Sequence, residues 1–427
     1  MFNGISPTPP VEVFHVNRCF QLDKDPRKVN LTIGAYRTDE GKPWILPVVR
    51  EAEQLLPSRE DHTHEYLPIL GNPTFREHAA RVLFGESYEK IKNKLATVQC
   101  LGGTGALRVG LEFVHHTGLT NTAYISDPTW GNHSLILERV GYKVIKKYRY
   151  WNSAQRNIDF EGMMNDLKST FVQGFQFFED VFHCGNLNHF FLQEAPERAV
   201  VVLHACAHNP TGMDLSLSQW KQLCELIKAK NLYPFFDIAY QGFATGSLED
   251  DASAPRYFCN AGVEFSIAQS FSKNFGLYNE RVGCLSVLLS NESLIEATNA
   301  HLTTIVRANY SNPPNHGSKL VEIVLSNERL KQKWLENMKE MSSRVRNVRQ
   351  EFRAKLEAFG APGSWRHITD QIGLFSFTGL NEKQTKYLTD VHHIYLLKNG
   401  RINMCGLNSS NVEYVAKAFV DALLHAS

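Results

Sequence analysis

The stretch Tyr233–Tyr240, YPFFDIAY, places an acidic residue, Asp237, near the end of a strongly apolar run. A continuous apolar run such as Tyr233–Ile238 is typical of a strand that is buried on both faces of a parallel sheet. Comparable runs occur at Thr122–Ser126, Ala199–His204 and Gly283–Leu289. From about residue 46 to residue 309 these runs alternate with helical stretches, so the sequence predicts an α/β fold with a mostly parallel sheet covered by helices.

The carboxylate of Asp237 would be costly at the end of such a strand unless a cation compensates it. A protonated pyridine nitrogen is one such cation, and a ring that keeps this proton acts as an electron sink. A structural salt bridge explains Asp237 equally well when the residue is considered alone.

A second candidate segment is Ser270–Arg281, SFSKNFGLYNER, which follows the apolar stretch Glu264–Ala268. Lys273 in this segment is a candidate nucleophile. A lysine amine becomes a covalent catalyst when burial or nearby cations lower its pKa, and Arg281 is a cation that could do so. Taken alone, a lysine in a loop is usually solvated.

The stretch Leu101–Phe113, LGGTGALRVGLEF, has glycines and a threonine at the start of an expected helix. The free backbone N–H groups and the dipole of such a helix start can receive a phosphate. The segment lacks the Gly-Lys-Ser/Thr ending of a Walker loop, and a lone glycine-rich turn is more often only a turn.

Composition narrows the class of partner. The chain has 427 residues, 43% of them apolar, with 45 basic against 44 acidic residues. This balance gives no net field for nucleic acid or an anionic membrane, so we expect a small-molecule partner. Eight cysteines without a CxxC pair indicate reduced thiols rather than zinc or disulfides. The N-terminal stretch has no basic, then apolar, signal pattern, so we expect a cytoplasmic protein.

The C-terminal part begins with a long helix predicted from Glu328 to Phe359, capped by Asn327 and ended by Gly360 with Pro362. Apolar residues recur along it every three or four positions: Leu330, Trp334, Met338, Met341, Val345, Val348, Phe352 and Leu356. This helix is expected to lead into a small domain that also includes the N-terminal arm. In that domain we expect a strand at Gly373–Thr378 and helices at Glu382–Val391 and Ser410–His425.

Ten ordered blocks together resemble the aspartate aminotransferases of the cytosolic type, over nearly the whole chain. The blocks are IGAYRTDEGKPWILPVVR, EYLPILG, LGGTGALR, SDPTWGNH, LHACAHNPTG, FFDIAYQGFA, SFSKNFGLYNERVG, IVRANYSNPP, ITDQIGLFSFTGL and GRINMCGL. The chain looks like a divergent paralogue of the cytosolic enzyme. The resemblance implies the fold type I of pyridoxal-phosphate-dependent transferases, with a seven-stranded, mostly parallel sheet in a large domain (residues 46–325) and a smaller α/β domain (residues 1–45 plus 326–427).

The resemblance also implies a set of residues for pyridoxal 5'-phosphate. Lys273 resembles the Schiff-base lysine, which also moves the proton between the substrate's α-carbon and C4′ of the cofactor, and Asp237 resembles the partner of the pyridine nitrogen. Tyr240 and Asn209 resemble the donors to the phenolate oxygen, which lower the pKa of the imine. The remaining cofactor residues are Trp130, stacked on the ring; His133, bonded to the aspartate; Gly103, Thr104, Ser270 and Arg281, around the phosphate; and Tyr66, reaching the phosphate from the other subunit of a homodimer.

Substrate binding in this family uses two arginines, because a guanidinium binds a carboxylate through two parallel hydrogen bonds. Arg401 resembles the arginine for the α-carboxylate, and Arg307 resembles the one donated across the dimer to the side-chain carboxylate. Gly34, Trp130 and Asn209 would complete the substrate contacts. The pair of arginines implies dicarboxylic amino acids and 2-oxo acids as substrates.

The chain departs from the family most clearly at residues 169–193, a probable insertion that contains seven phenylalanines. A surface excursion folded back on the large domain is one interpretation, and a contact with a partner or a membrane surface is the other, because exposed rings favour association. His183, Cys184 and His189 lie in this segment, but their spacing matches no common zinc pattern, so no metal site is predicted.

Three smaller departures lie closer to the expected site. Tyr310 stands where the family usually has tryptophan, and Cys100 precedes the phosphate residues. Glu12 stands where an apolar residue helps to close the site, and a charge there would lower turnover without affecting the cofactor.

The expected reaction is transamination of aspartate with 2-oxoglutarate, with ping-pong kinetics. Racemisation or decarboxylation of acidic amino acids is the alternative that keeps the cofactor, and aromatic amino acids are a further possibility for the substrate. A non-enzymatic paralogue that binds a partner is the alternative from another class. The lysine, the aspartate and the two arginines argue against it.

Overall fold

The computed structural model describes residues 4–6, 10–169 and 198–426, and the chain divides into two compact units. Unit 2 comprises Leu46–His208 and Asp214–Met338, and unit 1 comprises Met1–Ile45, Asn209–Met213 and Lys339–Ser427. These units differ from the expected domains at residues 209–213 and 326–338, and the expected domain limits stay a prediction.

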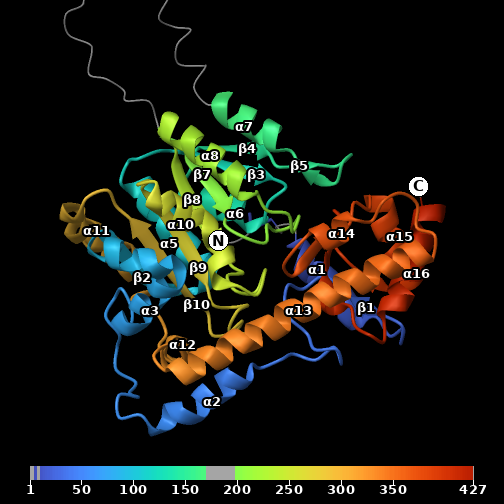
Figure 1. The fold of residues 1–427 in the computed structure, drawn as a ribbon, viewed down its shortest axis with the longest axis horizontal. Coiled ribbons are helices and arrows are strands. Elements are labelled where there is room, and N and C mark those ends of the chain that lie inside the picture. The colour runs from blue at the N-terminus through green and yellow to red at the C-terminus, as the bar shows by residue number, and fades with distance from the viewer. Residues whose placement is uncertain (1–3, 7–9, 170–197, 427) are drawn as a thin grey trace, which may run out of the picture. The chain divides into compact units, whose positions relative to one another are not determined.

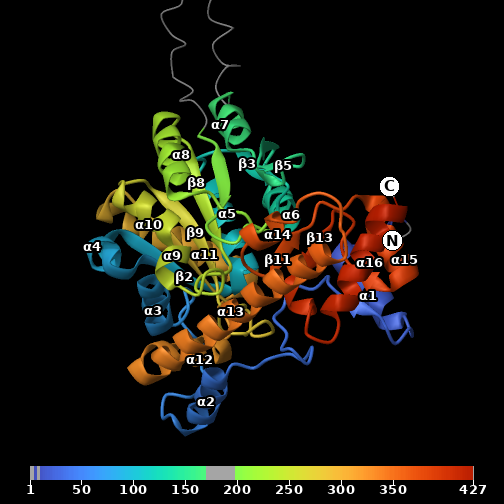
Figure 2. The same cartoon turned by 45° about the vertical axis from the view of Figure 1, so that its right-hand side comes forward.

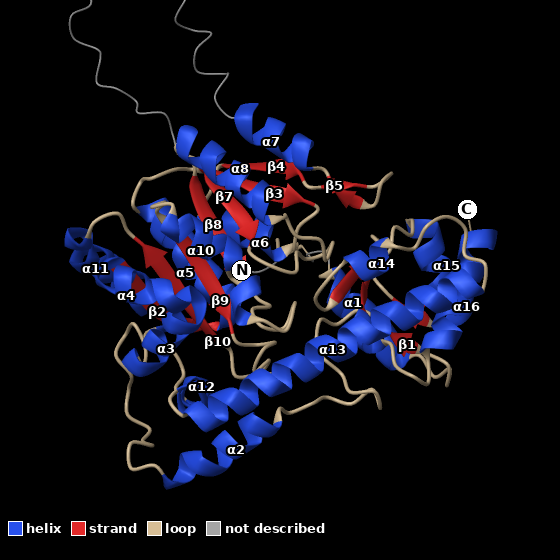
Figure 3. Ribbon diagram, in the orientation of Figure 1, coloured by secondary structure: helices blue, strands red, loops and turns tan. Residues whose placement is uncertain are grey.

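Unit 2 is built on a seven-stranded sheet with the strand order β2-β10-β9-β8-β7-β3-β4. Its strands are β2 (Leu95–Leu101), β3 (Thr122–Asp127), β4 (Val144–Arg149), β7 (Val200–His204), β8 (Tyr233–Ile238), β9 (Phe265–Ser270) and β10 (Val282–Leu288). Strand β10 runs antiparallel to both of its neighbours, and the other pairs are parallel. Every residue of β7, β8, β9 and β10 is buried. The mostly parallel seven-stranded sheet is therefore confirmed (Figure 3).

Helices make up most of the rest of unit 2 (Figure 1). They are α2 (Pro47–Leu55), α3 (Pro73–Phe84), α4 (Tyr88–Ile91), α5 (Gly102–His116), α6 (Asn132–Val140), α7 (Phe160–Lys168), α8 (Leu217–Ala229), α9 (Leu248–Asp251), α10 (Ser253–Asn260), α11 (Ile295–Tyr310) and α12 (His316–Leu325). Helix α5 packs directly on β2, β9 and β10. A Cβ atom on Gly110 of this helix would lie 2.6 Å from the ring of Phe235, so the close approach of helix and sheet requires glycine there.

Short elements complete unit 2. They are the 3₁₀ turns η1 (Leu56–Ser58), η2 (Gly85–Ser87), η3 (Lys92–Lys94) and η5 (Glu292–Leu294), and a hairpin of β5 (Trp151–Asn152) and β6 (Asn157–Ile158). Strand β9 is longer at its C-terminal end than predicted, because the polar residues Gln269 and Ser270 are also buried and pair with β10.

Unit 1 contains two small sheets covered by helices. Strand β1 (Val29–Asn30) pairs in parallel with β12 (Ile394–Tyr395), and β11 (Phe375–Phe377) pairs antiparallel with β13 (Arg401–Asn403). Its helical elements are α1 (Glu12–Leu22), α14 (His367–Asp370), α15 (Glu382–His392), η6 (Met404–Gly406) and α16 (Val412–His425). Helices α15 and α16 pack against each other (Figure 2).

Helix α13 (Glu328–Ala358) matches its predicted range to within one residue. The side chain of Asn327 accepts a hydrogen bond from the backbone N–H of Leu330 at 3.2 Å, as a capping residue does. All eight apolar residues of the predicted stripe are buried. Apolar residues three or four positions apart therefore mark the face of α13 that packs into the core.

Of two departures from the family, the structure describes Glu12 but not the greater part of the expected insertion. Residues 170–193 of the expected insertion, with His183, Cys184 and His189, lie outside the described residues. Glu12 is the first residue of α1, and its carboxylate accepts the backbone N–H of Lys398 at 2.8 Å within unit 1. Among the described residues, no helix has the length and apolar character needed to cross a membrane.

Candidate cofactor and substrate site

Asp237 lies near the carboxyl end of β8, in register with Ala268 of β9. Its side chain is buried, and Nε2 of His133, which is fully buried in α6, donates to Oδ2 at 3.1 Å. Burial on its own would raise the pKa of Asp237, but the hydrogen bond and charge of His133, with further positive charge that includes Lys273, hold that pKa below its ordinary value. This carboxyl is therefore ionised at neutral pH and can hold a cationic ring nitrogen.

Lys273 and Tyr240 follow the carboxyl ends of the neighbouring strands β9 and β8. The Nζ atom of Lys273 lies 5.2 Å from the centre of the Tyr240 ring. The charge of Lys273 is also one of those that lower the pKa of Asp237. Unit 2 therefore brings together three residues that were predicted from two sequence blocks, FFDIAYQGFA and SFSKNFGLYNERVG.

The expected phosphate residues converge at the start of helix α5. A Cβ atom on Gly103 would lie 3.0 Å from Cβ of Ser270, and one on Gly102 would lie 2.4 Å from Nη2 of Arg281. Gly102 has φ of +68° and donates its N–H to the carbonyl of Arg281 at 2.9 Å. Thr104 lies in the first turn of this helix, whose free N–H groups favour an anion.

The guanidinium of Arg281 is oriented by oxygen atoms of its own loop. Nη1 donates to the carbonyl of Tyr278 at 2.9 Å and to the hydroxyl of Ser272 at 3.3 Å. In the described part of the chain, Arg281 forms no ion pair with a carboxylate. Its charge is therefore available to a phosphate beside Gly103 and Ser270, and the residues present fit the phosphate of the expected cofactor.

Two residues that sequence reasoning missed extend the contacts of His133. The hydroxyl of Thr129 lies 2.9 Å from Nδ1 of His133 and 3.1 Å from Nε2 of His204. Burial, together with the nearby imidazoles of His208 and His133, lowers the pKa of His204 well below its ordinary value. The Thr129 hydroxyl, which can both donate and accept, therefore connects the two imidazoles and helps to orient His133 toward Asp237.

Trp130 lies next to this network. Its ring makes an edge contact with His133, with centroids 5.4 Å apart and an angle of 87° between the planes. It also packs against the core cluster of unit 2.

Arg401, Asn209 and Gly34 belong to unit 1. Arg401 is buried in β13, where Nη1 donates to Oδ1 of Asn209 at 3.2 Å and Nη2 donates to the carbonyl of Thr32 at 3.0 Å. The guanidinium carbon lies 4.0 Å from the centre of the Phe375 ring. A Cβ atom on Gly34 would lie 2.5 Å from the same ring, so this position requires glycine. Phe375 was not predicted as a site residue, although it lies in the sequence block ITDQIGLFSFTGL.

Tyr66 and Arg307 are not brought to these clusters in the single chain. Tyr66 is 83% exposed. Arg307 is exposed on α11, where Nη1 donates to the hydroxyl of Ser311 at 2.5 Å. Both residues were expected to act in the other subunit of a dimer, and that role stays a prediction.

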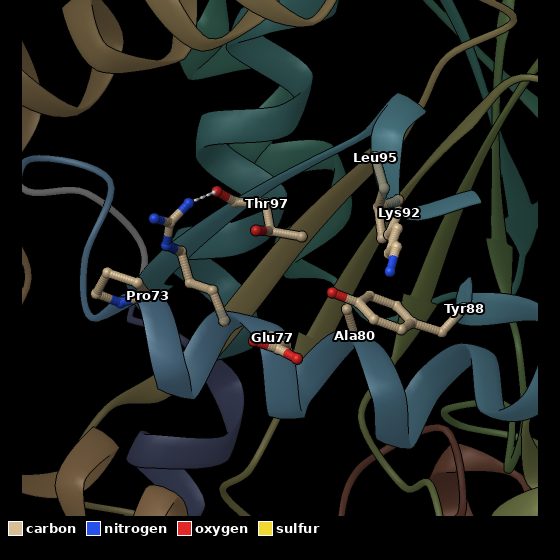
Figure 4. A pocket seen from close by; sticks show the side chains of 8 residues that line it. Pro73, Glu77, Ala80, Tyr88, Lys92, Leu95 and Thr97 are labelled. Atoms are coloured by element: carbon tan, nitrogen blue, oxygen red, sulfur yellow. Dashed lines mark hydrogen bonds between the residues drawn. The ribbon is translucent and has the colours of Figure 1, made fainter. Parts of the chain in front are cut away.

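A cavity of roughly 200 Å³ lies elsewhere in unit 2 (Figure 4). It is lined by Pro73, Arg76, Glu77, Ala80, Tyr88, Lys92, Leu95 and Thr97, and no residue of the expected site is among them. Arg76 donates to the carbonyl of Thr97 at 2.9 Å. Among the described residues, no group of three or more His, Cys, Asp and Glu side chains is arranged to hold a metal ion.

Comparison with known proteins decides the family. Residues 26–419 match the family model described as aminotransferase class I and II. The chain belongs to this family. The class I and II aminotransferase chain is 48% identical over 429 residues to the cytoplasmic aspartate aminotransferase of Gallus gallus, with 99% of this chain and 98% of the relative covered.

Solved aminotransferase structures agree closely with the fold. The aspartate aminotransferase from Saccharomyces cerevisiae cytoplasm matches with a TM-score of 0.90 at 38% identity, covering 100% of this chain and 99% of that chain. The aromatic-amino-acid aminotransferase from Burkholderia pseudomallei, covalently bound to pyridoxal phosphate, matches with a TM-score of 0.89 at 34% identity, covering 99% of each chain. The family and fold implied by the sequence blocks are therefore confirmed.

Proposed function

We propose that the chain is a pyridoxal-phosphate-dependent aminotransferase that converts L-aspartate and 2-oxoglutarate into oxaloacetate and L-glutamate. The observation that carries this proposal is the buried Asp237–His133 pair beside Lys273 at the ends of β8 and β9. The similarity to cytoplasmic aspartate aminotransferases supports the choice of substrates and a cytoplasmic location.

The cofactor would be held by the residues that the family resemblance implies. Pyridoxal phosphate, when bound, supplies an aldehyde that takes up the amino group and a ring that withdraws electrons from the substrate's α-carbon. Lys273 would hold the aldehyde carbon, and Asp237, oriented by His133, would hold the ring nitrogen. The ring would stack on Trp130, with Tyr240 and Asn209 at the phenolate oxygen and Gly103, Thr104, Ser270 and Arg281 around the phosphate.

The amine of Lys273 has two tasks in this proposal. It would bind the cofactor covalently, and once the substrate has taken its place, the amine would remove the proton from the substrate's α-carbon and deliver it to C4′ of the cofactor. Asp237 keeps a proton on the ring nitrogen, because a buried, ionised carboxylate favours the cationic partner. Tyr240 would donate its hydroxyl hydrogen to the phenolate oxygen of the cofactor and so lower the pKa of the nitrogen that joins Lys273 to the cofactor.

Arg401 would bind the α-carboxylate of the substrate. Its guanidinium is held by the carbonyl of Thr32, the amide of Asn209 and the ring of Phe375, so little of its freedom remains to be lost on binding. Gly34 would offer a backbone contact beside the same ring.

A homodimer completes the proposal. Arg307 of one subunit would bind the side-chain carboxylate of the substrate in the other subunit's site, and Tyr66 would reach the phosphate there. Both side chains are exposed in the single chain, which is compatible with their reaching the site of the other subunit. Analytical ultracentrifugation tests this point separately from activity.

A second candidate is transamination of aromatic amino acids. It is favoured by the similarity to the aromatic-amino-acid aminotransferase of Burkholderia pseudomallei. Steady-state kinetics with aspartate and with phenylalanine separate the two candidates, and chiral analysis of aspartate incubated without an oxo acid detects racemisation or decarboxylation.

The deciding experiment compares purified wild-type protein with Lys273→Ala and with Lys90→Ala, a control at an exposed lysine of α4. The wild type and Lys90→Ala should be yellow, change absorbance with aspartate and form oxaloacetate. Lys273→Ala should lose the covalent cofactor and the turnover. Turnover by Lys273→Ala at the wild-type rate would contradict the proposal.

A further inference from the structure

Two buried residues directly follow the two catalytic side chains of unit 2. Asn274 follows Lys273, Gln241 follows Tyr240, and both Asn274 and Gln241 are 0% exposed. The side-chain amide of Asn274, Nδ2, donates to the backbone carbonyl of Gln241 at 3.1 Å. One hydrogen bond therefore joins the loop after β9 to the loop after β8, immediately beside both functional groups.

The loop after β9 is fixed on its other side by helix α13. The indole Nε1 of Trp334 donates to the backbone carbonyl of Asn274 at 2.7 Å. The Trp334 ring also stacks on Phe275, with centroids 4.6 Å apart and 29° between the planes. Asn274 is thus held through its backbone while its side chain reaches across to Gln241.

The loop after β8 is held by other buried groups. The side chain of Gln241 donates to the carbonyl of Val82 at 2.9 Å and accepts from Nε2 of Gln269 at 3.2 Å. Asp251 accepts the backbone N–H groups of Gly242 and Ala244 at 2.8 and 3.1 Å. The carbonyl of Gln241 therefore stands at a fixed place, and Asn274 is the side chain that ties Lys273 to it.

We infer that Asn274 is a positioning residue for the transamination proposed above, on which this inference rests. Its amide sets the separation between the amine of Lys273 and the hydroxyl of Tyr240. The bond is buried, so no solvent replaces it when it is lost, and each loop then relaxes by itself. Asn274 itself touches neither substrate nor cofactor in this role.

The expected consequence is an electronic change at the bound cofactor. Tyr240 lowers the pKa of the nitrogen joining Lys273 to the cofactor only while its hydroxyl is held at the phenolate oxygen. Loss of the Asn274–Gln241 bond weakens that contact, so the absorbance of the bound cofactor should titrate at a higher pH, by about 0.5 to 1 unit. The KM for aspartate should stay within about twofold, because Arg401 is unaffected, while kcat falls by about tenfold.

The experiment uses the holoenzyme of the wild type, Asn274→Ala and Tyr142→Phe. The control removes a similar buried bond, from the Tyr142 hydroxyl to the carbonyl of Leu111 at 3.1 Å, away from the cofactor residues. Thermal unfolding, the absorbance titration and the separate kcat and KM values are measured for each protein. Asn274→Ala should shift the titration, and Tyr142→Phe should lower only the thermal midpoint.

Asn274→Ser keeps a shorter donor and serves if the alanine variant does not fold; it should give a smaller shift in the same direction. A titration midpoint equal to that of the wild type in a folded Asn274 variant would overturn the inference and leave the proposed function standing. A wild-type protein that binds no cofactor would overturn both.

Discussion

Asp237 and Asp251 are two buried carboxylates that follow one another along the same part of unit 2, yet their surroundings differ. Asp237 receives its hydrogen bond from a side chain, His133, and its pKa lies below the ordinary value. Asp251 is 2% exposed and receives hydrogen bonds from the backbone N–H groups of Gly242, Ala244 and Thr245 and from the Thr245 side chain. Burial raises the pKa of Asp251 to about 7, although these donors oppose the rise.

The difference shows what separates a reacting carboxylate from an anchoring one. Asp237 faces side chains that carry or exchange protons, so its ionised form can be matched to a cationic partner. Asp251 faces backbone N–H groups and the Thr245 side chain, all from one loop, and among the described residues it forms no ion pair with a cation. Burial alone therefore does not identify a functional acid; the chemical type of its partners does.

The largest expected effect comes from Asp237→Asn, which keeps the size of the side chain and removes its charge. The amide oxygen can still accept from His133, so the fold should persist. Because a neutral amide cannot hold a proton on the ring nitrogen, we expect kcat/KM for aspartate to fall by about 10² to 10⁴ fold. Steady-state kinetics with the cofactor in excess measures this.

Asp237→Glu is the matched control, since it restores the charge at a slightly different position. It should recover part of the lost rate. A rate for the asparagine variant within tenfold of the wild type would mean that the charge of Asp237 is not what the reaction uses.

The predicted limits of strand β8 match the structure at both ends, and those of helix α13 match to within one residue. Both predictions succeed because the evidence for each element is local. A strand buried on both faces is a continuous apolar run, and a helix that buries one face repeats its apolar residues every three or four positions. The predicted limits of β9 were less accurate, because its residue Gln269 is polar although it is buried. Its hydrogen bond to Gln241, which the sequence does not reveal, explains that burial.

The network around the site could not be predicted in the same way. Thr129 and His204 meet only because β3 lies next to β7 and β7 next to β8, and a single sequence does not give the strand order. Asp251 looks like a surface acid in the run LEDD, and it is buried only because the loop from Gly242 to Thr245 closes over it. Asp237, Lys273 and the glycine-rich start of α5 were candidates from residue chemistry alone, whereas the other site residues came from the family resemblance. The roles of all of them stay predictions.

A medium effect on stability is expected from Asp251→Asn. The folded pKa of about 7 lies above the unfolded value of 3.8, so the folded state holds the proton more tightly between these values. The wild-type free energy of unfolding therefore falls as the pH rises through this window, whereas the asparagine variant loses this dependence. From pH 5 to pH 8 its stability relative to the wild type should increase by about 2 to 3 kcal/mol.

Urea unfolding of both proteins at pH 5 and pH 8 gives the difference in free energy of unfolding between the variant and the wild type at each pH, and the change in that difference tests the prediction. A change of the opposite sign would show that the hydrogen-bond donors outweigh burial at Asp251. The contrast between a titratable partner, His133, and the fixed donors of one loop would then not account for the two carboxylates.

The smallest effect is expected from Tyr310→Phe, which extends the comparison to a buried hydroxyl with a weak partner. The Tyr310 hydroxyl is buried and interacts with the thiol of Cys100. A thiol is a weak hydrogen-bond partner, so removal of the hydroxyl should change the free energy of unfolding by less than about 1 kcal/mol. Thermal and urea unfolding measure the change, with Tyr148→Phe as the control, because the Tyr148 hydroxyl donates to the carbonyl of Val202 at 2.8 Å and its loss should destabilise. If Tyr310→Phe destabilises as much as Tyr148→Phe, the thiol is as good a partner for a buried hydroxyl as a backbone carbonyl is.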